Sequence, residues 1–180
     1  IAQELRFDHH ITCGHVCALS QQEESIAMAT LDAVARLPIT LISLPITNLL
    51  LQDAQTGRTP RLRGITLIKE ARERGIPVMI ASDNVQDPFC AVGSYDPLEA
   101  FLTATTVAQL PNPFDTWSAS ICRSDWLLGT GQDLPMSVGA ADDVVIFNDA
   151  NAWSFPSRCH SRTVVRRGLV SHSTLEGIRS

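Results

Sequence analysis

The sequence has few aromatic residues and little net charge. Of its 180 residues, 6% are aromatic, 18% are charged, and the formal net charge is −5. The acidic balance argues against a nucleic-acid surface. No apolar run approaches the roughly eighteen residues that a membrane-spanning helix needs. We therefore expect neither a nucleic-acid partner nor a membrane. A hydrophobic content of 44% is sufficient for a buried core. The length of 180 residues suggests one domain or slightly more than one.

The sequence also lacks the pattern of a disulfide framework. Its five cysteines are odd in number and irregularly spaced: Cys13, Cys17, Cys90, Cys122 and Cys159. This usage favours reduced thiols and a cytoplasmic location. No second cysteine pair follows "CGHVC" at a zinc-finger distance, so we do not expect a structural zinc site.

The chain does contain a regular alternation of strand-like and helical patterns. Short apolar runs, rich in β-branched residues, predict strands at 10–15, 39–46 and 76–81. Helical spacing of apolar residues predicts helices at 21–36, 65–75, 96–112 and 116–128, with Asp96 as N-cap and Pro97 at the first helical position. This alternation is typical of parallel βαβ units in an α/β fold.

Polar residues follow each predicted strand, and the pattern changes near the end of the chain. The strand ends at His15, Asn48 and Asp83 lie roughly 35 residues apart, which suits one βα unit each. From about residue 131, short strands and Gly-containing turns predict a small β module, with strands at 144–147 and on both sides of Gly168. We therefore expect two domains, 1–130 and 131–180, with a boundary between Thr130 and Met136.

Three segments carry a family resemblance: "TPRLRGITLIKE" (59–70), "ASDNVQDPF" (81–89) and, less specifically, "VGAADDVVIF" (138–147). With them, the chain resembles the C-terminal half of a cytosine-deaminase-type member of the metal-dependent amidohydrolase superfamily. The resemblance implies strands six to eight of a (β/α)8 TIM-type barrel, followed by part of a small β-sandwich. A whole barrel needs about 250 residues, so we expect a partial one here.

Two motifs of that family are missing. No His-x-His occurs, and no histidine has Glu at the third following position. The resemblance assigns the first metal ligands and a proton-shuttling glutamate to these motifs. We therefore expect the chain to be a piece of something longer, with the N-terminal half of the barrel supplied by the same or a separate chain. The alternative is an inactive remnant.

Two residues are the candidate catalytic groups. The resemblance makes Asp83 a metal ligand and proton acceptor, a task that suits a carboxylate beside metal-bound water. It makes His15 a group that hydrogen-bonds the attacking water or the substrate, which suits an imidazole. The alternatives are a turn or cap residue for Asp83 and a satisfied core histidine for His15. The implied cofactor is one divalent metal ion, Zn²⁺ or Fe²⁺.

Further residues are candidates for substrate contact. The resemblance places a substrate-recognising side chain at Asn84 and an aromatic cover for the substrate ring at Phe89. Related cytosine deaminases carry Asp where Asn84 stands, which leaves the base open because Asn both donates and accepts. Phe89 has the alternative of a core residue. For Asn48 and Gln52 two interpretations stay open: they line the substrate pocket, or they are only polar residues of a turn and a loop.

The predicted activity is hydrolytic deamination of cytosine or a related nucleobase or small heterocycle, with release of ammonia. The alternatives are hydrolysis of another cyclic amide or triazine-like ring, and a catalytically incomplete half-barrel that serves as an interaction module. We expect a small heterocyclic substrate and a homo-oligomer. A group of arginines on the 52–64 loop suggests a solvated or subunit-contact face: Arg58, Arg61 and Arg63.

Overall fold

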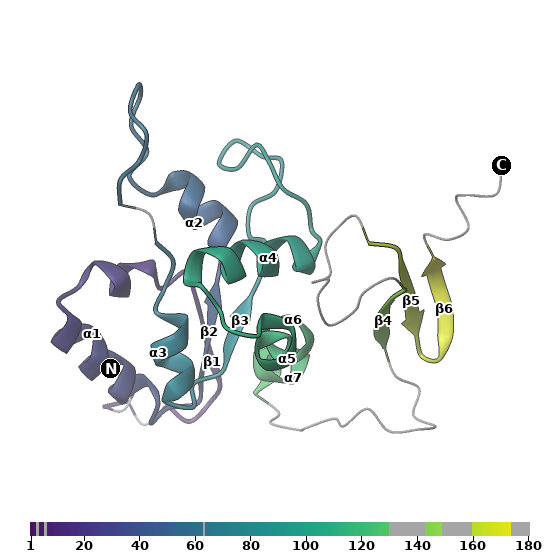
Figure 1. The fold of residues 1–180 in the computed structure, drawn as a ribbon. Helices are drawn as coiled ribbons and strands as arrows, with labels where there is room; N and C mark the ends of the chain where they lie inside the picture. Colours follow the sequence, from purple (N-terminus) through teal and green to yellow (C-terminus); the bar gives the residue numbers. More distant parts are fainter. Residues whose placement is uncertain (3, 6, 63, 130–142, 149–159, 174–180) are drawn as a thin grey trace. The chain divides into compact units, whose positions relative to one another are not determined.

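The computed structural model describes residues 1–2, 4–5, 7–62, 64–129, 143–148 and 160–173 (Figure 1). The chain divides into two compact units, Ile1–Gly131 and Gln132–Ser180. The boundary that we predict between Thr130 and Met136 lies outside the described residues, as do Arg63 and Cys159.

The first unit is built on a parallel sheet. Its strands in the described part of the chain are β1 (Ile11–Gly14), β2 (Ile39–Ser43) and β3 (Val78–Ile80), in the order β1-β2-β3. Both neighbouring pairs are parallel. β3 is buried along its whole length, as expected for a strand covered on both faces. The predicted parallel βαβ arrangement is confirmed.

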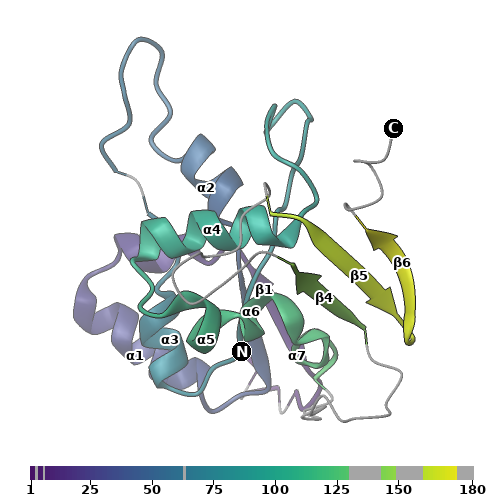
Figure 2. The same cartoon turned by 45° about the vertical axis from the view of Figure 1, so that its right-hand side comes forward.

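Helices connect the strands and cover the sheet. Their bounds are η1 (Cys17–Gln21), α1 (Glu24–Val34), α2 (Pro45–Leu51), α3 (Ile68–Glu73), α4 (Pro97–Ala108), α5 (Pro113–Trp117), α6 (Ala119–Cys122) and α7 (Ser124–Leu128). α3, α4 and α6 contact β3, and α1 contacts α3. Figures 1 and 2 show the loops after α2 and after β3 extending from the same end of the sheet. No helix in the described ranges is both long and apolar enough to cross a membrane.

Three predicted elements differ from the structure. β2 ends at Ser43, and Pro45 begins the helix α2, because proline suits the first helical position and the following leucines are good helix formers. The predicted helix 21–36 is present as α1 but is shorter, from Glu24 to Val34, and η1 precedes it. The predicted helix 116–128 is three short helices, interrupted at Ser118 and Arg123.

Helix α4 supplies the largest fully buried side chain of the first unit. As predicted, Asp96 is its N-cap, and the side chain accepts a hydrogen bond from the Leu98 N–H at 3.1 Å. Pro97 occupies the first turn. Phe101 is completely buried. α4 therefore anchors the segment that follows β3.

The second unit contains an antiparallel sheet. Its described strands are β4 (Val144–Phe147), β5 (Arg162–Arg166) and β6 (Leu169–Ser173), in the order β4-β5-β6. Arg167 and Gly168 join β5 to β6, both with positive φ, as a tight hairpin turn requires. The strands predicted at 144–147 and around Gly168 are confirmed.

Candidate active site

Three side chains meet where the parallel strands end. His15 directly follows β1, Asn48 lies on α2 after β2, and Asp83 follows β3 by three residues. His15 Nδ1 lies 2.8 Å from Asn48 Oδ1, and His15 Nε2 lies 3.8 Å from Asp83 Oδ2. The carboxyl ends of parallel strands are where barrel enzymes place catalysis. The structure thus brings the two predicted catalytic residues close to each other, and Asn48 contacts one of them, His15.

The backbone turns sharply at two of these strand ends. His15 and Asp83 have φ values of 62° and 65°, in the left-handed region. Val16 also lies there, with φ 51°, although β-branched residues rarely adopt this conformation. Such strain persists where the surrounding structure imposes it, and it is concentrated at functional sites. Here it coincides with the ends of β1 and β3.

Asn48, predicted at the end of a strand as a pocket-lining or turn residue, lies instead within the helix α2. It is only 7% exposed, and its Oδ1 faces the His15 ring. Its Nδ2 is buried and has no hydrogen-bond partner within the ranges that the structure describes. Asn48 is therefore not a surface turn residue at the end of a strand. The signal that was available is Pro45 followed by three leucines at 49–51, which marks a helix start.

Asp83 carries a buried carboxylate oxygen that no donor among the described residues satisfies. Its Oδ2 has no hydrogen-bond partner, and 3.8 Å to His15 Nε2 is too long for a hydrogen bond. An unpartnered carboxylate oxygen fits a cation ligand, because hard divalent ions and zinc accept such oxygens. Among the described residues, however, no group of three or more His, Cys, Asp and Glu side chains forms a metal site. The described part of the chain thus offers Asp83 as a suitable ligand and not a complete set.

The loop after Asp83 is organised by Asp87. Asp87 Oδ1 accepts hydrogen bonds from the N–H groups of Phe89 and Cys90 at 2.9 and 2.8 Å, and its Oδ2 accepts one from Asn84 Nδ2. The pKa of Asp87 is lowered below its usual value. The hydrogen bond from Asn84 has the largest effect, and the one from the Cys90 N–H has the next largest. The amide nitrogen of Asn84 is therefore engaged within the loop, which leaves its Oδ1 available as an acceptor.

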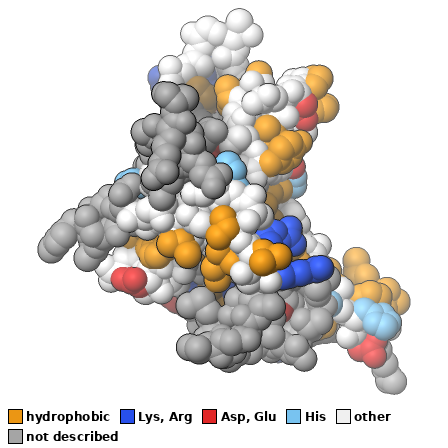
Figure 3. Space-filling model, turned by 90° about the vertical axis from the view of Figure 1, so that its right-hand side faces the viewer, with side chains coloured by type: hydrophobic (Ala, Val, Ile, Leu, Met, Phe, Trp, Pro, Cys, Tyr) orange, Lys and Arg blue, Asp and Glu red, His pale blue; other side chains and the backbone are white. Residues whose placement is uncertain are grey.

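Phe89 is exposed. Its side chain is 65% accessible, so Phe89 does not belong to the core of the first unit as described. Other exposed apolar residues of α2 and this loop are Leu50, Leu51, Val92 and Tyr95. Figure 3 shows hydrophobic side chains exposed in several groups on one face of the molecule. Phe89 is free to contact a ligand, and its predicted role as a ring cover stays a prediction.

The long loop after α2 is held by its own polar contacts. Gln52 Oε1 accepts a hydrogen bond from the Gly64 N–H, which ties the two ends of the loop together. Asp53 accepts hydrogen bonds from the Arg61 and Leu62 N–H groups and pairs with Arg58 at 2.6 Å. These contacts lower the pKa of Asp53, and the hydrogen bond from the Arg61 N–H has the largest effect. Gln52 and Arg58 thus shape the loop itself.

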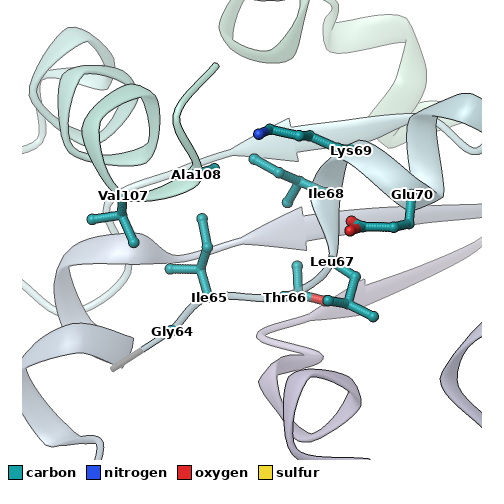
Figure 4. A pocket seen from close by; sticks show the side chains of 9 residues that line it. All are labelled: Gly64, Ile65, Thr66, Leu67, Ile68, Lys69, Glu70, Val107 and Ala108. Atoms are coloured by element: carbon teal, nitrogen blue, oxygen red, sulfur yellow. The ribbon is translucent and has the colours of Figure 1, made fainter. Parts of the chain in front are cut away.

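A separate surface pocket lies between α3 and α4. It is lined by Gly64, Ile65, Thr66, Leu67, Ile68, Lys69, Glu70, Val107 and Ala108 (Figure 4). Its lining comes from the segment that leads into α3 and from the end of α4. None of the predicted site residues takes part in it, so this pocket and the cluster at the strand ends are different features.

Comparison with known proteins gives relatives that are longer than this chain. No family model matches it. The chain is 42% identical over 176 residues to a pterin deaminase of Rhizobium rhizogenes, a match that covers 96% of this chain and 40% of that protein. The chain thus spans about 40% of the length of this relative.

Solved structures agree with the fold of the described chain. One is 5-methylcytosine deaminase from Klebsiella pneumoniae liganded with 5-fluorocytosine, with a TM-score of 0.75, 23% identity, and coverage of 89% of this chain and 40% of that one. Another is N-isopropylammelide isopropylaminohydrolase from Burkholderia multivorans, with a TM-score of 0.67, 21% identity, and coverage of 94% and 40%. At these identities the likeness concerns the fold alone.

Proposed function

We infer the function of this chain from its similarity to part of amidohydrolase-family deaminases. The similarity extends over about 40% of the length of those proteins. We propose that it contributes one side of the active site of a metal-dependent hydrolytic deaminase. The substrate would be a nucleobase or a related small nitrogen heterocycle. Water would add to the ring carbon that bears the amino group, the carbon–nitrogen bond would break, and ammonia and a ring carbonyl would result.

The observation that carries this proposal is the meeting of His15, Asn48 and Asp83 at the carboxyl ends of the parallel strands. A bound Zn²⁺ or Fe²⁺ would lower the pKa of water so that hydroxide is available near neutral pH. Asp83 would be one ligand, and its unpartnered Oδ2 is free to accept a proton from water. His15 would orient the water or the substrate. Further ligands and the glutamate that protonates the ring would come from outside this chain.

The Asn84–Asp87 contact bears on the substrate. Because Asp87 holds the amide nitrogen of Asn84, the side chain offers its oxygen as an acceptor. This oxygen supplies an acceptor, as does the aspartate which related cytosine deaminases carry at this position, while the second N–H of the amide remains a donor. A ring that presents an N–H or an amino group to Asn84 is therefore preferred, and both pterin and cytosine rings can do so. Phe89, exposed on the same loop, would cover the ring.

We propose an aminopyrimidinone ring as the substrate, with pterin tested first. The 42% identity to a pterin deaminase supports this order. The alternative, hydrolysis of another cyclic amide or a triazine-like ring, has a basis in the structural match to an N-isopropylammelide hydrolase.

The remaining expectations form part of the same proposal. The first unit would be strands six to eight of a (β/α)8 barrel, and the second unit a share of a β-sandwich. The rest of the barrel would be supplied by an N-terminal portion, in the same or a separate chain. We further propose a homo-oligomer and a cytoplasmic location. The latter is supported by the free thiols at Cys13, Cys17, Cys90 and Cys122.

The test is ammonia release by the protein that contains this chain together with its N-terminal portion. The substrates are pterin, cytosine, isocytosine, a creatinine-like ring and an aminotriazine. Asp83→Asn should abolish release, and Asp115→Asn, which changes an exposed carboxylate of α5, should not. Release from the triazine alone would favour the alternative. No release from any ring would refute the enzyme and leave the half-barrel interaction module as the better account.

A further inference from the structure

We propose that Asn48 is a positioning residue that sets the tautomer of His15, with the proton on Nδ1 and the lone pair of Nε2 directed toward Asp83. Its consequence for catalysis rests on the proposed function. The tautomer itself does not, because it follows from contacts within this chain.

The contact between the two residues has hydrogen-bond geometry. The 2.8 Å between His15 Nδ1 and Asn48 Oδ1 lies within the range of N–H···O hydrogen bonds. The amide oxygen only accepts, so Nδ1 must donate. In a neutral imidazole the other nitrogen is then an acceptor. The lone pair of Nε2 therefore lies on the side of the ring that faces Asp83.

The acceptor is held rigidly, whereas the histidine alone is not. The His15 side chain is 50% exposed, but Asn48 is 7% exposed and lies inside α2. The Asn48 N–H donates to Leu44 O at 3.1 Å, and Asn48 O accepts from the Gln52 N–H at 2.9 Å. A partly exposed ring that is hydrogen-bonded to a buried helical residue takes its orientation from that residue.

This tautomer determines what fits between His15 and Asp83. Nε2 and Asp83 Oδ2, 3.8 Å apart, are then two acceptors, and Oδ2 has no donor. Together they suit a group with two O–H donors, such as a water molecule. The opposite tautomer would require the Asn48 amide to be turned so that Nδ2 donates to Nδ1. His15 would then present an N–H to Asp83 and could not accept a proton from water at Nε2.

Selective ¹⁵N labelling of histidine in the full-length protein tests the tautomer directly. Long-range ¹H–¹⁵N spectra, recorded where the ring is neutral, should show His15 protonated on Nδ1, with the signal assigned by its loss in His15→Gln. Asn48→Leu, which removes both polar atoms, should move the proton toward Nε2. Asn48→Asp, which keeps an acceptor and removes the donor, should restore Nδ1–H. A wild-type His15 protonated on Nε2, or an unchanged tautomer in Asn48→Leu, would overturn the proposal.

The activity assay separates this proposal from the proposed function. Outer hydrogen-bond partners of metal-ligating histidines typically contribute about 10- to 100-fold to metal affinity or activity, and we take the same range for the partner of His15. We expect a loss of this size in kcat/KM for Asn48→Leu and partial recovery in Asn48→Asp. Full activity in a stable Asn48→Leu variant would overturn the positioning role. If no heterocycle is deaminated by the wild type while the spectra show Nδ1–H, the proposed function fails and the tautomer assignment stands. If Asn48→Leu does not fold, the wild-type and Asn48→Asp spectra still decide.

Discussion

Replacing Asp83 by glycine should stabilise the metal-free protein, although Asp83 is the predicted catalytic carboxylate. Two features of Asp83 oppose folding. Its backbone lies in the left-handed region, with φ 65°, which costs a residue with a side chain about 1 kcal/mol. Its Oδ2 is buried and finds no hydrogen-bond partner in the described part of the chain, which costs about 1–3 kcal/mol. Glycine removes both costs.

The net effect is smaller than that sum. Glycine gives the unfolded chain more conformational freedom, which opposes folding by about 0.4–1 kcal/mol. We therefore expect Asp83→Gly to raise the free energy of unfolding by about 1–3.5 kcal/mol. Asp83→Asn, which tolerates the left-handed backbone and loses the charge, separates the two contributions.

The assay is urea unfolding of the metal-free protein, followed by tryptophan fluorescence. The matched control is Asp96→Ala, which removes an N-cap that the fold uses and should lower the free energy of unfolding by about 1 kcal/mol. In the full-length protein with saturating zinc, the wild type should gain stability that the Asp83 variants do not. If metal-free Asp83→Gly is destabilised as much as Asp96→Ala, Asp83 supports the fold and the reasoning is refuted.

Three further predictions concern the fold around the site. Phe101→Ala should lower the free energy of unfolding by about 3–5 kcal/mol, measured by urea unfolding, because Phe101 is completely buried. Gly129→Ala should destabilise by about 1–3 kcal/mol in the same assay, because a Cβ at this positive-φ site would lie 2.6 Å from the His10 ring; unchanged stability would contradict the packing. The pKa of Asp87 is lowered on folding, so its stabilising contribution is present above the unfolded value of about 3.9 and is lost as the pH falls through the lower folded value. Asp87→Asn should flatten the pH dependence of stability in that acidic range, and an unchanged profile would show that the Asn84 contact contributes little.

The sequence was sufficient for the elements whose signals are local. The β-branched runs of β1 and β3 and the Asp96-Pro97 start of α4 lie where their patterns predict. The Gly168 hairpin also follows from a local signal, since glycine adopts the positive φ of the turn. Each of these features depends on the conformational preferences of neighbouring residues.

Local signals failed where packing decides between alternatives. The region 116–128 has helical spacing throughout, but the chain breaks it at Ser118 and Arg123. After Arg123, the buried Asp125 is paired with Arg123 at 2.6 Å, and the Trp126 carbonyl accepts a hydrogen bond from Thr40 of β2. A contact with a strand more than 80 residues earlier in the chain is not visible in a helical pattern.

By itself, the sequence determined that polar residues follow three strand-like apolar runs, because the end of such a run is visible in the composition. It also determined the family likeness, which is carried by contiguous motifs. Only the tertiary structure decided which polar groups meet. The parallel register brings the ends of β1 and β3 to the same edge, and the helix that starts at Pro45 turns Asn48 toward His15. These positions depend on non-local strand pairing and on the rotation of a packed helix, and neither is specified by the residues next to Asn48.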